Sequence, residues 1–217
     1  MNFEQARFNM VEQQIRTWNV LDTAMLQALS SLPREQFVPT AYQSLAYTDT
    51  EIPLGHGQTM LPPRVDARLV HDLKLTGPEV VLEIGSGYGY MTALLAKRCQ
   101  RVIGLELIPE LAAQAQRHLS LAGLDHAEVR VGDGAHLAIP EGPFDAIVLG
   151  GSVAEVPSSL LNQLKVGGKL LAIVGEEPVM QACLYTRTSG DQWASRALWD
   201  TIAPPLIGFA QPSRFKF

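Results

Sequence analysis

The sequence predicts an α/β fold, a doubly wound and mostly parallel sheet that ends in an antiparallel hairpin and follows an N-terminal helical and loop extension. From residue 79 on, apolar runs typical of buried strands alternate with segments of helical spacing, which favours a parallel sheet with helices on both faces. A glycine-rich turn follows the first of these runs. Near the C-terminal end, two strand-like segments flank Ser189-Gly190-Asp191, which predicts a hairpin.

The first 78 residues differ in character from the rest. Apolar side chains recur there at helical spacing, and Asp22 is a typical N-cap for a helix that stops before Pro33. Residues 39–63 are rich in Pro, Gly, Tyr and Thr, and this composition predicts an extended loop. The helices expected in this part span residues 3–18, 23–32 and 63–73.

The remaining elements follow from the alternation after residue 79. The expected strands are 79–84, 101–106, 127–131, 144–149 and 169–174. The expected helices are 89–98, 109–122 and 157–164, and the expected hairpin strands are 180–188 and 193–202. At 217 residues the chain fits a single domain, with residues 1–78 as the extension and 79–217 as the sheet part. Ligands of such sheets bind at the carboxyl ends of the strands.

The turn Gly85-Ser86-Gly87-Tyr88-Gly89 carries glycine at alternate positions, which allows a tight turn and a close approach of the backbone to a ligand. Its pattern differs from the GxGxxG of a dinucleotide site. Glu83 precedes the turn inside the strand, where a carboxylate attracts a cation and repels a pyrophosphate. S-adenosylmethionine carries a sulfonium and an ammonium group. The turn therefore indicates that cofactor before it indicates NAD.

Two later strand ends carry acidic residues. Glu106 ends the second strand, 21 residues after Gly85, which suits a bidentate contact with two ribose hydroxyls. Gly132-Asp133-Gly134 follows the third strand, where the carboxylate is able to accept from an adenine amino group. A glycine cluster alone is often only a turn. Three such turns on consecutive strand ends favour a ligand that contains adenosine.

Composition narrows the function classes. The net charge of −5 disfavours nucleic acid as a partner. No apolar run approaches the length of a membrane span, and the N-terminus lacks the basic and apolar regions of a secretory signal, so a cytoplasmic location is expected. Cys99 and Cys183 stand in no metal or redox spacing, and the histidines show no metal-ligand spacing. We expect two reduced thiols and no metal.

Seven segments together resemble the protein-L-isoaspartate O-methyltransferase family over nearly the whole chain. The glycine turn alone indicates only the class I S-adenosylmethionine-dependent methyltransferases, which have a Rossmann-like sheet, whereas LPREQFVP and GHGQT make the resemblance specific. The segments are residues 10–15 (MVEQQI), 32–39 (LPREQFVP), 46–49 (AYTD), 55–59 (GHGQT), 81–90 (VLEIGSGYGY), 132–134 (GDG) and 163–168 (QLKVGG).

The resemblance implies methyl transfer from S-adenosylmethionine to the carboxylate of L-isoaspartyl residues in damaged proteins or peptides. S-adenosylhomocysteine is then the product, and the ester collapses to a succinimide, which is the basis of protein repair. It also implies that Gly57, Gln58 and Thr59 close over the methionine end and face the substrate. His56 in the same loop is either a donor to the acceptor carboxylate or a solvated loop histidine, and the catalytic candidates are therefore Thr59, Gln58 and His56. The implied cofactor-binding residues are Gly57, Glu83, Gly85, Ser86, Gly87, Gly89, Glu106, Leu107, Asp133 and Gly134.

The chain departs from the family pattern in two places. Two residues after Thr59, where the family has a serine whose hydroxyl lies in the active site, the chain has Leu61, which forms no side-chain hydrogen bond. Gly150-Gly151-Ser152 stands where the family usually has Thr-Ala-Ala, either as a close approach to a ligand or as a flexible turn. Ser152 also offers a hydroxyl from another direction. A carboxylate acceptor is already ionised at pH 7 and needs no general base, so the missing serine weakens the reaction without abolishing it.

Several alternatives stay open. Leu61 is compatible with a different acceptor, or with a cofactor-binding protein that has lost turnover and acts as a sensor. Amino methylation of nucleic acid is disfavoured because no Asn/Asp-Pro-Pro-aromatic motif follows the fourth strand, and a dehydrogenase is disfavoured by the missing GxGxxG. Tyr47 and Asp49 either line the acceptor cleft or shape the loop, and Arg34 with Glu35 is interpreted as structural. The oligomeric state and the docking of residues 209–217 are not indicated.

Overall fold

The structure is a computed structural model that describes residues 2–137 and 139–211. Its main sheet has seven strands in the order β5-β4-β3-β6-β7-β8-β9, and β1 with β2 forms a separate hairpin. The strands are β1 Ile52–Gly55, β2 Gln58–Met60, β3 Val80–Ile84, β4 Arg101–Glu106, β5 Ala127–Val131, β6 Phe144–Val153, β7 Leu164–Glu176, β8 Val179–Ser189 and β9 Gln192–Asp200. The α-helices are α1 Phe3–Met10, α2 Thr23–Ser31, α3 Pro63–Asp72, α4 Tyr90–Ala96, α5 Pro109–Leu121 and α6 Ser158–Leu161.

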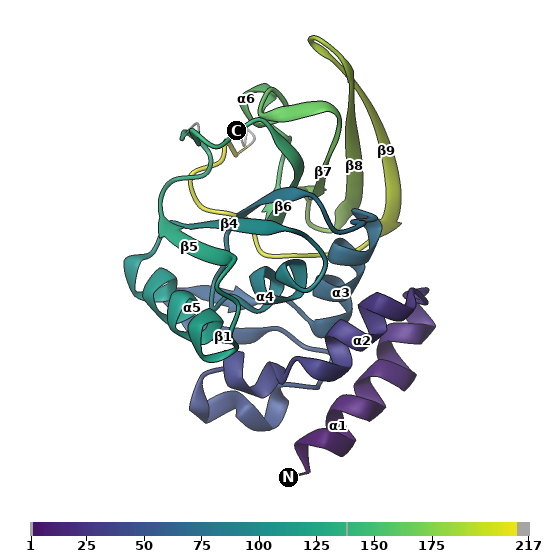
Figure 1. Cartoon of the computed structure of the whole chain (residues 1–217), viewed down its shortest axis with the longest axis vertical. Coiled ribbons are helices and arrows are strands. Elements are labelled where there is room, and N and C mark those ends of the chain that lie inside the picture. Colours follow the sequence, from purple (N-terminus) through teal and green to yellow (C-terminus); the bar gives the residue numbers. More distant parts are fainter. Residues whose placement is uncertain (1, 138, 212–217) are drawn as a thin grey trace, which may run out of the picture.

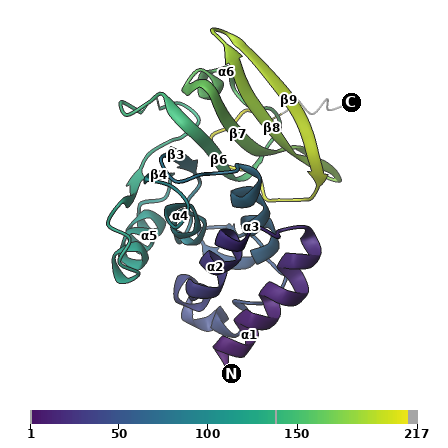
Figure 2. The ribbon, with the colours of Figure 1, turned by 45° about the vertical axis from the view of Figure 1, so that its right-hand side comes forward.

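The predicted fold class is confirmed. Strands β5, β4, β3, β6 and β7 pair in parallel, and β8 and β9 add to the β7 edge in antiparallel fashion. The N-terminal helices and the long β8–β9 hairpin lie at opposite ends of the molecule (Figure 1). The turned view shows α1, α2 and α3 packed together beside the sheet (Figure 2).

Side chains of the central strands alternate between two apolar cores, as the two-residue period of a strand requires. Val81 and its neighbours on adjacent strands face the larger core, which includes the N-terminal helices and α3, α4 and α5. Leu82 and Ile103 face the smaller core, which includes α6. Because both faces are covered, the strand ends at the carboxyl edge are held in fixed positions.

The predicted N-terminal helices are present with one difference in winding. The helix expected over 3–18 is continuous in the chain, but α1 passes into a π-helical turn, Val11–Ile15, and then a 3₁₀ turn, Arg16–Trp18. The Asp22 N-cap is confirmed, since its Oδ1 accepts from the Met25 backbone N–H at 2.8 Å.

The prediction of an extended loop over residues 39–63 was wrong in part, because this segment contains the β1–β2 hairpin. His56 and Gly57 form its two-residue turn, both with positive φ (54° and 70°). Two-residue hairpins favour turns of this kind, because their twist matches that of the flanking strands. The segment therefore contains regular hydrogen-bonded structure that its composition did not reveal.

The fourth strand of the main sheet is longer than predicted. Gly150, Gly151 and Ser152 lie inside β6 rather than in a turn after it. Ser152 pairs through its backbone with the C-terminal segment, donating to Pro204 O at 2.8 Å and accepting from Leu206 N at 2.9 Å. This pairing extends β6 beyond the sequence expectation of 144–149.

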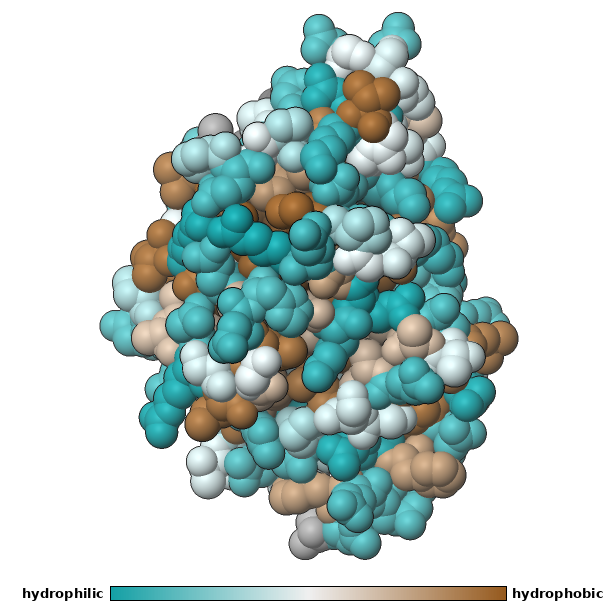
Figure 3. Space-filling view, viewed as in Figure 1, coloured by the Kyte–Doolittle hydropathy of each residue, from teal (hydrophilic) through white to brown (hydrophobic). Residues whose placement is uncertain are grey.

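The expected helix over 157–164 is also shorter. It ends at Leu161, since Leu164 already pairs with Phe144 and begins β7. No helix in the described ranges, 2–137 and 139–211, has the length and apolar character that crossing a bilayer requires. The face in Figure 3 is largely hydrophilic, with apolar residues in small separate groups.

Candidate active site

A cavity opens at the carboxyl edge of β3, β4, β5 and β6. It encloses about 560 Å³, open mouth included. Residues of the β1–β2 hairpin also line it, as do residues 206, 207 and 209 of the C-terminal segment that follows β9. The lining residues are Leu54, Gln58, Thr59, Ile84, Gly85, Gly87, Leu105, Glu106, Leu107, Ile108, Leu111, Gly132, Asp133, Gly134, Gly150, Leu206, Ile207 and Phe209.

Glu106 is the organising carboxylate of this cavity. The residue is 6% exposed, its Oε2 accepts from Gly87 N at 2.8 Å, and its Oε1 accepts from Ile108 N at 3.0 Å. These two bonds tie the glycine turn and the start of α5 to the end of β4. Each carboxylate oxygen keeps further acceptor capacity. Glu106 is therefore able to accept from two neighbouring hydroxyls of a ligand.

The glycines at the strand ends leave no space for a side chain. A Cβ at Gly134 would lie 2.4 Å from Ile84 Cγ2, and one at Gly150 would lie 2.2 Å from Gly85 O. Gly85 itself has a φ of 84°, in the left-handed region that favours glycine. Gly150 thus packs against the backbone of Gly85, and Gly134 against the side chain of Ile84.

Asp133 marks the far end of the cavity. Its Oδ1 accepts from Ala135 N at 3.0 Å, and its Oδ2 lies 2.8 Å from His136 Nδ1. The hydrogen bond with His136 holds the pKa of the Asp133 carboxyl below its usual value, so the group is an ionised acceptor at neutral pH. Leu107 lines the same cavity and is 38% exposed.

A second cavity, of about 330 Å³ by the same measure, adjoins the first. It shares Leu54, Thr59, Gly85, Gly87 and Gly150 with the first cavity. Its other lining residues are Met60, Leu61, Asp66, Glu83, Ser86, Tyr88, Tyr90 and Met91. The shared residues make the two cavities neighbouring parts of one site.

Glu83 lies fully buried on the wall of the second cavity. Its Oε2 accepts from Ser86 Oγ at 3.0 Å and from Thr92 Oγ1. Its Oε1 is buried and has no partner among the described residues. Burial raises the pKa of the Glu83 carboxyl to about 7. A buried carboxylate oxygen without a partner needs a cationic donor to offset its desolvation, so the site fits a ligand with an ammonium group.

A buried ion pair forms part of the wall of the second cavity, because Asp66 lines it. The Arg34 guanidinium is fully buried, with Nη1 at 2.7 Å from Asp66 Oδ2 and Nη2 donating to Leu61 O at 2.6 Å. Burial raises the pKa of the Asp66 carboxyl to about 6, against the opposing effect of Arg34. The structural interpretation of Arg34 is confirmed, because it fixes the backbone at the end of β2.

Most of the predicted site residues line the two cavities, and three do not. His56 lies exposed at the tip of the β1–β2 turn, and Gly57 beside it also lies outside both linings. Gly89 is the N-cap of α4, where a Cβ would lie 3.1 Å from Ala115 Cβ. The predicted residues that line a cavity are Gln58, Thr59, Glu83, Gly85, Ser86, Gly87, Glu106, Leu107, Asp133 and Gly134.

The hydroxyl of Ser152 does not replace the missing serine. Ser152 is 1% exposed and its Oγ donates to Ala203 O at 2.8 Å. It lines neither of the two cavities. A Cβ at Gly151 would lie 2.8 Å from Pro204 O, so Gly151 makes room for the C-terminal segment. Gly150 packs against Gly85 and lines both cavities, and neither glycine lies in a flexible turn.

The C-terminal segment is the part of the site that the sequence did not reveal. Leu206, Ile207 and Phe209 line the first cavity. The signal was the pair of adjacent glycines in β6, whose purpose is evident only once the segment crosses them. Phe215 and Phe217 of the tail lie outside the described residues.

Tyr47 and Asp49 shape the loop and line neither cavity. The Tyr47 hydroxyl donates to Glu35, and Asp49 Oδ1 lies 2.6 Å from Arg64 Nε. The structural interpretation of Glu35 is confirmed by the first of these bonds. Both contacts connect the segment before β1 to other parts of the N-terminal extension.

The decisive comparison is with protein families. The model of the protein-L-isoaspartate(D-aspartate) O-methyltransferase family (PCMT) matches residues 5–207. The chain belongs to this family. Protein-L-isoaspartate O-methyltransferase 1 of Rhodopseudomonas palustris is 40% identical over 208 residues, which cover 95% of this chain and 85% of the relative. The Methanoculleus marisnigri enzyme of the same name is 41% identical and covers 93% of this chain and 91% of its own.

Solved structures agree on the fold. A protein-L-isoaspartate O-methyltransferase structure aligns with a TM-score of 0.82 at 23% identity, covering 93% of this chain and 66% of its own. A Plasmodium falciparum protein described as a member of the same family, in complex with S-adenosyl-L-homocysteine, aligns with a TM-score of 0.77 at 23% identity, covering 95% and 98%. Identities this low establish the fold alone.

Proposed function

We propose that this family member transfers a methyl group from S-adenosylmethionine to the side-branch carboxylate of L-isoaspartyl residues, as the first step of protein repair. The relatives at about 40% identity are named for this activity. The structural observation that carries the proposal is the pair of buried carboxylates, Glu83 and Glu106, at the ends of adjacent strands facing one site. That arrangement fits a cationic ligand with a ribose.

The residues present fit the cofactor. Glu106 is placed to hold the ribose hydroxyls, and Asp133 beside Gly134 is placed to meet the adenine. The free Oε1 of Glu83 is the partner that an ammonium group needs. When bound, the cofactor supplies a methyl group on a positively charged sulfur. These roles divide the site into a nucleoside part in the first cavity and an amino-acid part in the second.

The protein's own contribution to the reaction is positioning and exclusion of water. A carboxylate acceptor is ionised at pH 7, so no residue has to remove a proton from it. Holding the attacking oxygen in line and stripping its water are the remaining tasks. Leu54 and Thr59 of the β1–β2 hairpin line both cavities, where they would exclude water from the bound ligands.

The side chain of Leu61 favours a second candidate for the methyl acceptor. Leu61 is 4% exposed and lines the second cavity, which makes that wall apolar where the resemblance implies a serine. A different carboxylate acceptor, methylated with the same cofactor, is therefore the second candidate.

The proposal also includes a cytoplasmic location. It further holds that residues 1–78 and 79–217 act together as one methyltransferase domain. The free thiols of Cys99 and Cys183 support a reducing compartment.

Mass spectrometry of the product tests the proposal. An isoaspartyl peptide incubated with the protein and S-adenosylmethionine is expected to gain the mass of one methylene group, then to lose methanol as the ester closes to a succinimide. Fragmentation should place the gain on the isoaspartyl residue. A methyl group on another residue of the peptide would favour the second candidate instead.

A further inference from the structure

A carboxylate acceptor in the second cavity needs a hydrogen-bond donor, and two of the hydroxyls lining it are already engaged with carboxylates. Ser86 Oγ donates to Glu83 Oε2 at 3.0 Å, and Thr59 Oγ1 donates to Glu51 Oε2 at 3.2 Å. Both bonds are internal to the protein. An acceptor would have to break one of them to gain either hydroxyl.

Tyr90 carries a hydroxyl without such a bond. The residue is 2% exposed and lines the second cavity, and its buried Oη donates no hydrogen bond to a described residue. The nearby Arg34 guanidinium is a donor only, so it leaves the hydroxyl proton free. Leaving a hydroxyl buried and unpaired costs about 1–3 kcal/mol, so an unpaired group of this kind calls for an explanation. A bound ligand in the cavity supplies one.

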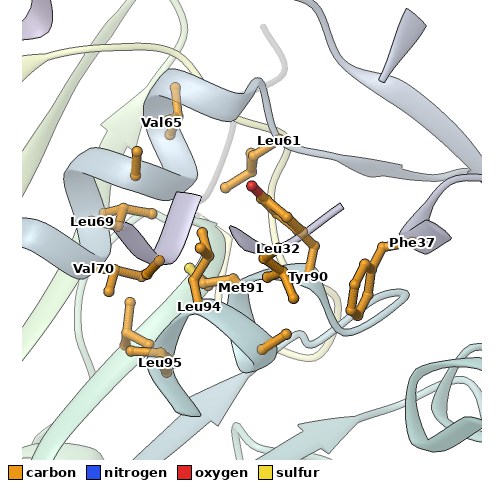
Figure 4. Close-up of a cluster of buried hydrophobic side chains, with 14 of the residues drawn as sticks. Leu32, Phe37, Leu61, Val65, Leu69, Val70, Tyr90, Met91, Leu94 and Leu95 are labelled. Carbon is orange, nitrogen blue, oxygen red and sulfur yellow. The ribbon is translucent and has the colours of Figure 1, made fainter. Parts of the chain in front are cut away.

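The hydroxyl points to the place where the site lacks a donor. In Figure 4 the Tyr90 side chain runs from α4 toward Leu61, with its oxygen at the Leu61 end. Both residues line the same cavity. The Tyr90 hydroxyl therefore points toward the part of the cavity that residue 61 lines.

The ring that carries the hydroxyl is held firmly. The Phe37 ring contacts it in a T-shaped arrangement, with 5.7 Å between centroids, and the Arg34 guanidinium carbon lies 4.5 Å from its centroid. Burial holds the pKa of the Tyr90 hydroxyl above its usual value, so it remains a protonated donor throughout the neutral range. A donor fixed in this way loses little entropy when it binds a carboxylate.

We infer that the Tyr90 hydroxyl binds the acceptor carboxylate and replaces the serine hydroxyl that Leu61 has removed. The inference rests on the proposed function, since it requires a carboxylate acceptor. Tyr90 forms no bond to the methyl group and moves no proton. It orients the attacking carboxylate, and the methyl transfer itself is unchanged.

Tyr90→Phe removes only this oxygen and tests the inference. We expect kcat/KM for an isoaspartyl peptide to fall about 10- to 100-fold, the effect of one hydrogen bond to a charged group. Calorimetric affinity for S-adenosylhomocysteine should stay within about twofold, and the Tm should be unchanged or higher, because an unpaired buried oxygen has been removed. Tyr185→Phe on β8, outside both cavities, is the matched control and should change none of the three.

The single variant Leu61→Ser and the double variant Leu61→Ser, Tyr90→Phe complete the cycle. Tyr90→Phe should cost much less kcat/KM in the Leu61→Ser background than in the wild type, a coupling that independent residues do not show. The inference is overturned if Tyr90→Phe keeps its kcat/KM, if it loses affinity for S-adenosylhomocysteine by the same factor, or if it costs as much kcat/KM in the Leu61→Ser background. A wild-type protein that leaves the isoaspartyl peptide unmethylated overturns the proposed function and the inference with it.

Discussion

Glu106→Gln is expected to lower the affinity for S-adenosylhomocysteine by about 100-fold or more, measured by calorimetry. Both carboxylate oxygens accept backbone N–H groups, from Gly87 and from Ile108. A glutamine has one oxygen and one NH₂, so one of these N–H groups must face another donor. The variant therefore loses a ribose acceptor and disturbs the glycine turn, and hydrogen bonds to charged groups are worth about 1.5–3 kcal/mol each.

Glu110→Gln is the matched control, because Glu110 is exposed in the first turn of α5 and lines neither cavity. It should leave the affinity unchanged. If Glu106→Gln binds as tightly as this control, Glu106 does not hold the ribose and the nucleoside part of the site has been assigned wrongly.

Glu83→Gln is expected to weaken the binding of S-adenosylhomocysteine and, at the same time, to stabilise the ligand-free protein. The Oε1 oxygen of Glu83 has no protein partner, and a neutral amide replaces the charge that an ammonium group would meet. Affinity for S-adenosylhomocysteine should fall about 10- to 100-fold, the loss of a charge-assisted bond in a buried site. The Tm without ligand at pH 8 should rise, because the variant no longer buries a carboxylate that lacks a partner.

The pH dependence has a definite sign. The folded-state pKa of Glu83 is raised by burial to about 7 from 4.5, so the fold favours the neutral acid. The corresponding stability is complete below pH 4.5 and is lost as the pH rises through 7. Affinity for the cationic ligand changes in the opposite direction and should increase between pH 6 and 8 in the wild type.

In the Glu83→Gln variant, neither the loss of stability nor the gain in ligand affinity that Glu83 causes as the pH rises should be seen. Thermal scans and calorimetric titrations at pH 6, 7 and 8 measure them. A variant that melts below the wild type at pH 8, or whose affinity rises with pH as steeply, would show that Glu83 is not the group responsible.

Most of the residues predicted to bind the cofactor line the two cavities, because local patterns determine where they lie. Their roles stay predictions. Glu83, the glycine turn and Glu106 all lie at or next to strand ends, and parallel pairing brings the ends of adjacent strands together. The two cofactor-binding predictions that fell outside the cavities, Gly57 and Gly89, are glycines whose conformations a hairpin turn and a helix start require. A glycine pattern does not distinguish these uses.

The sequence could not predict features that depend on distant segments. The extension of β6 requires Ser152 to pair with Pro204, and no local pattern in residues 144–153 reports that contact. The buried cluster at the wall of the second cavity joins Arg34, Asp66 and Tyr90, from three separate elements. The β1–β2 turn exposes His56 to solvent, which the spacing of its neighbours did not predict, and its contact with a substrate stays a prediction.

The most direct test of the account is the transfer of labelled methyl from S-adenosylmethionine to an isoaspartyl peptide, with the matched aspartyl peptide as control. Binding of S-adenosylhomocysteine is verified by calorimetry in the same preparation. The account predicts label on the isoaspartyl peptide and none above background on the aspartyl one. Equal labelling of both peptides, or no labelling by protein that binds S-adenosylhomocysteine, would contradict it.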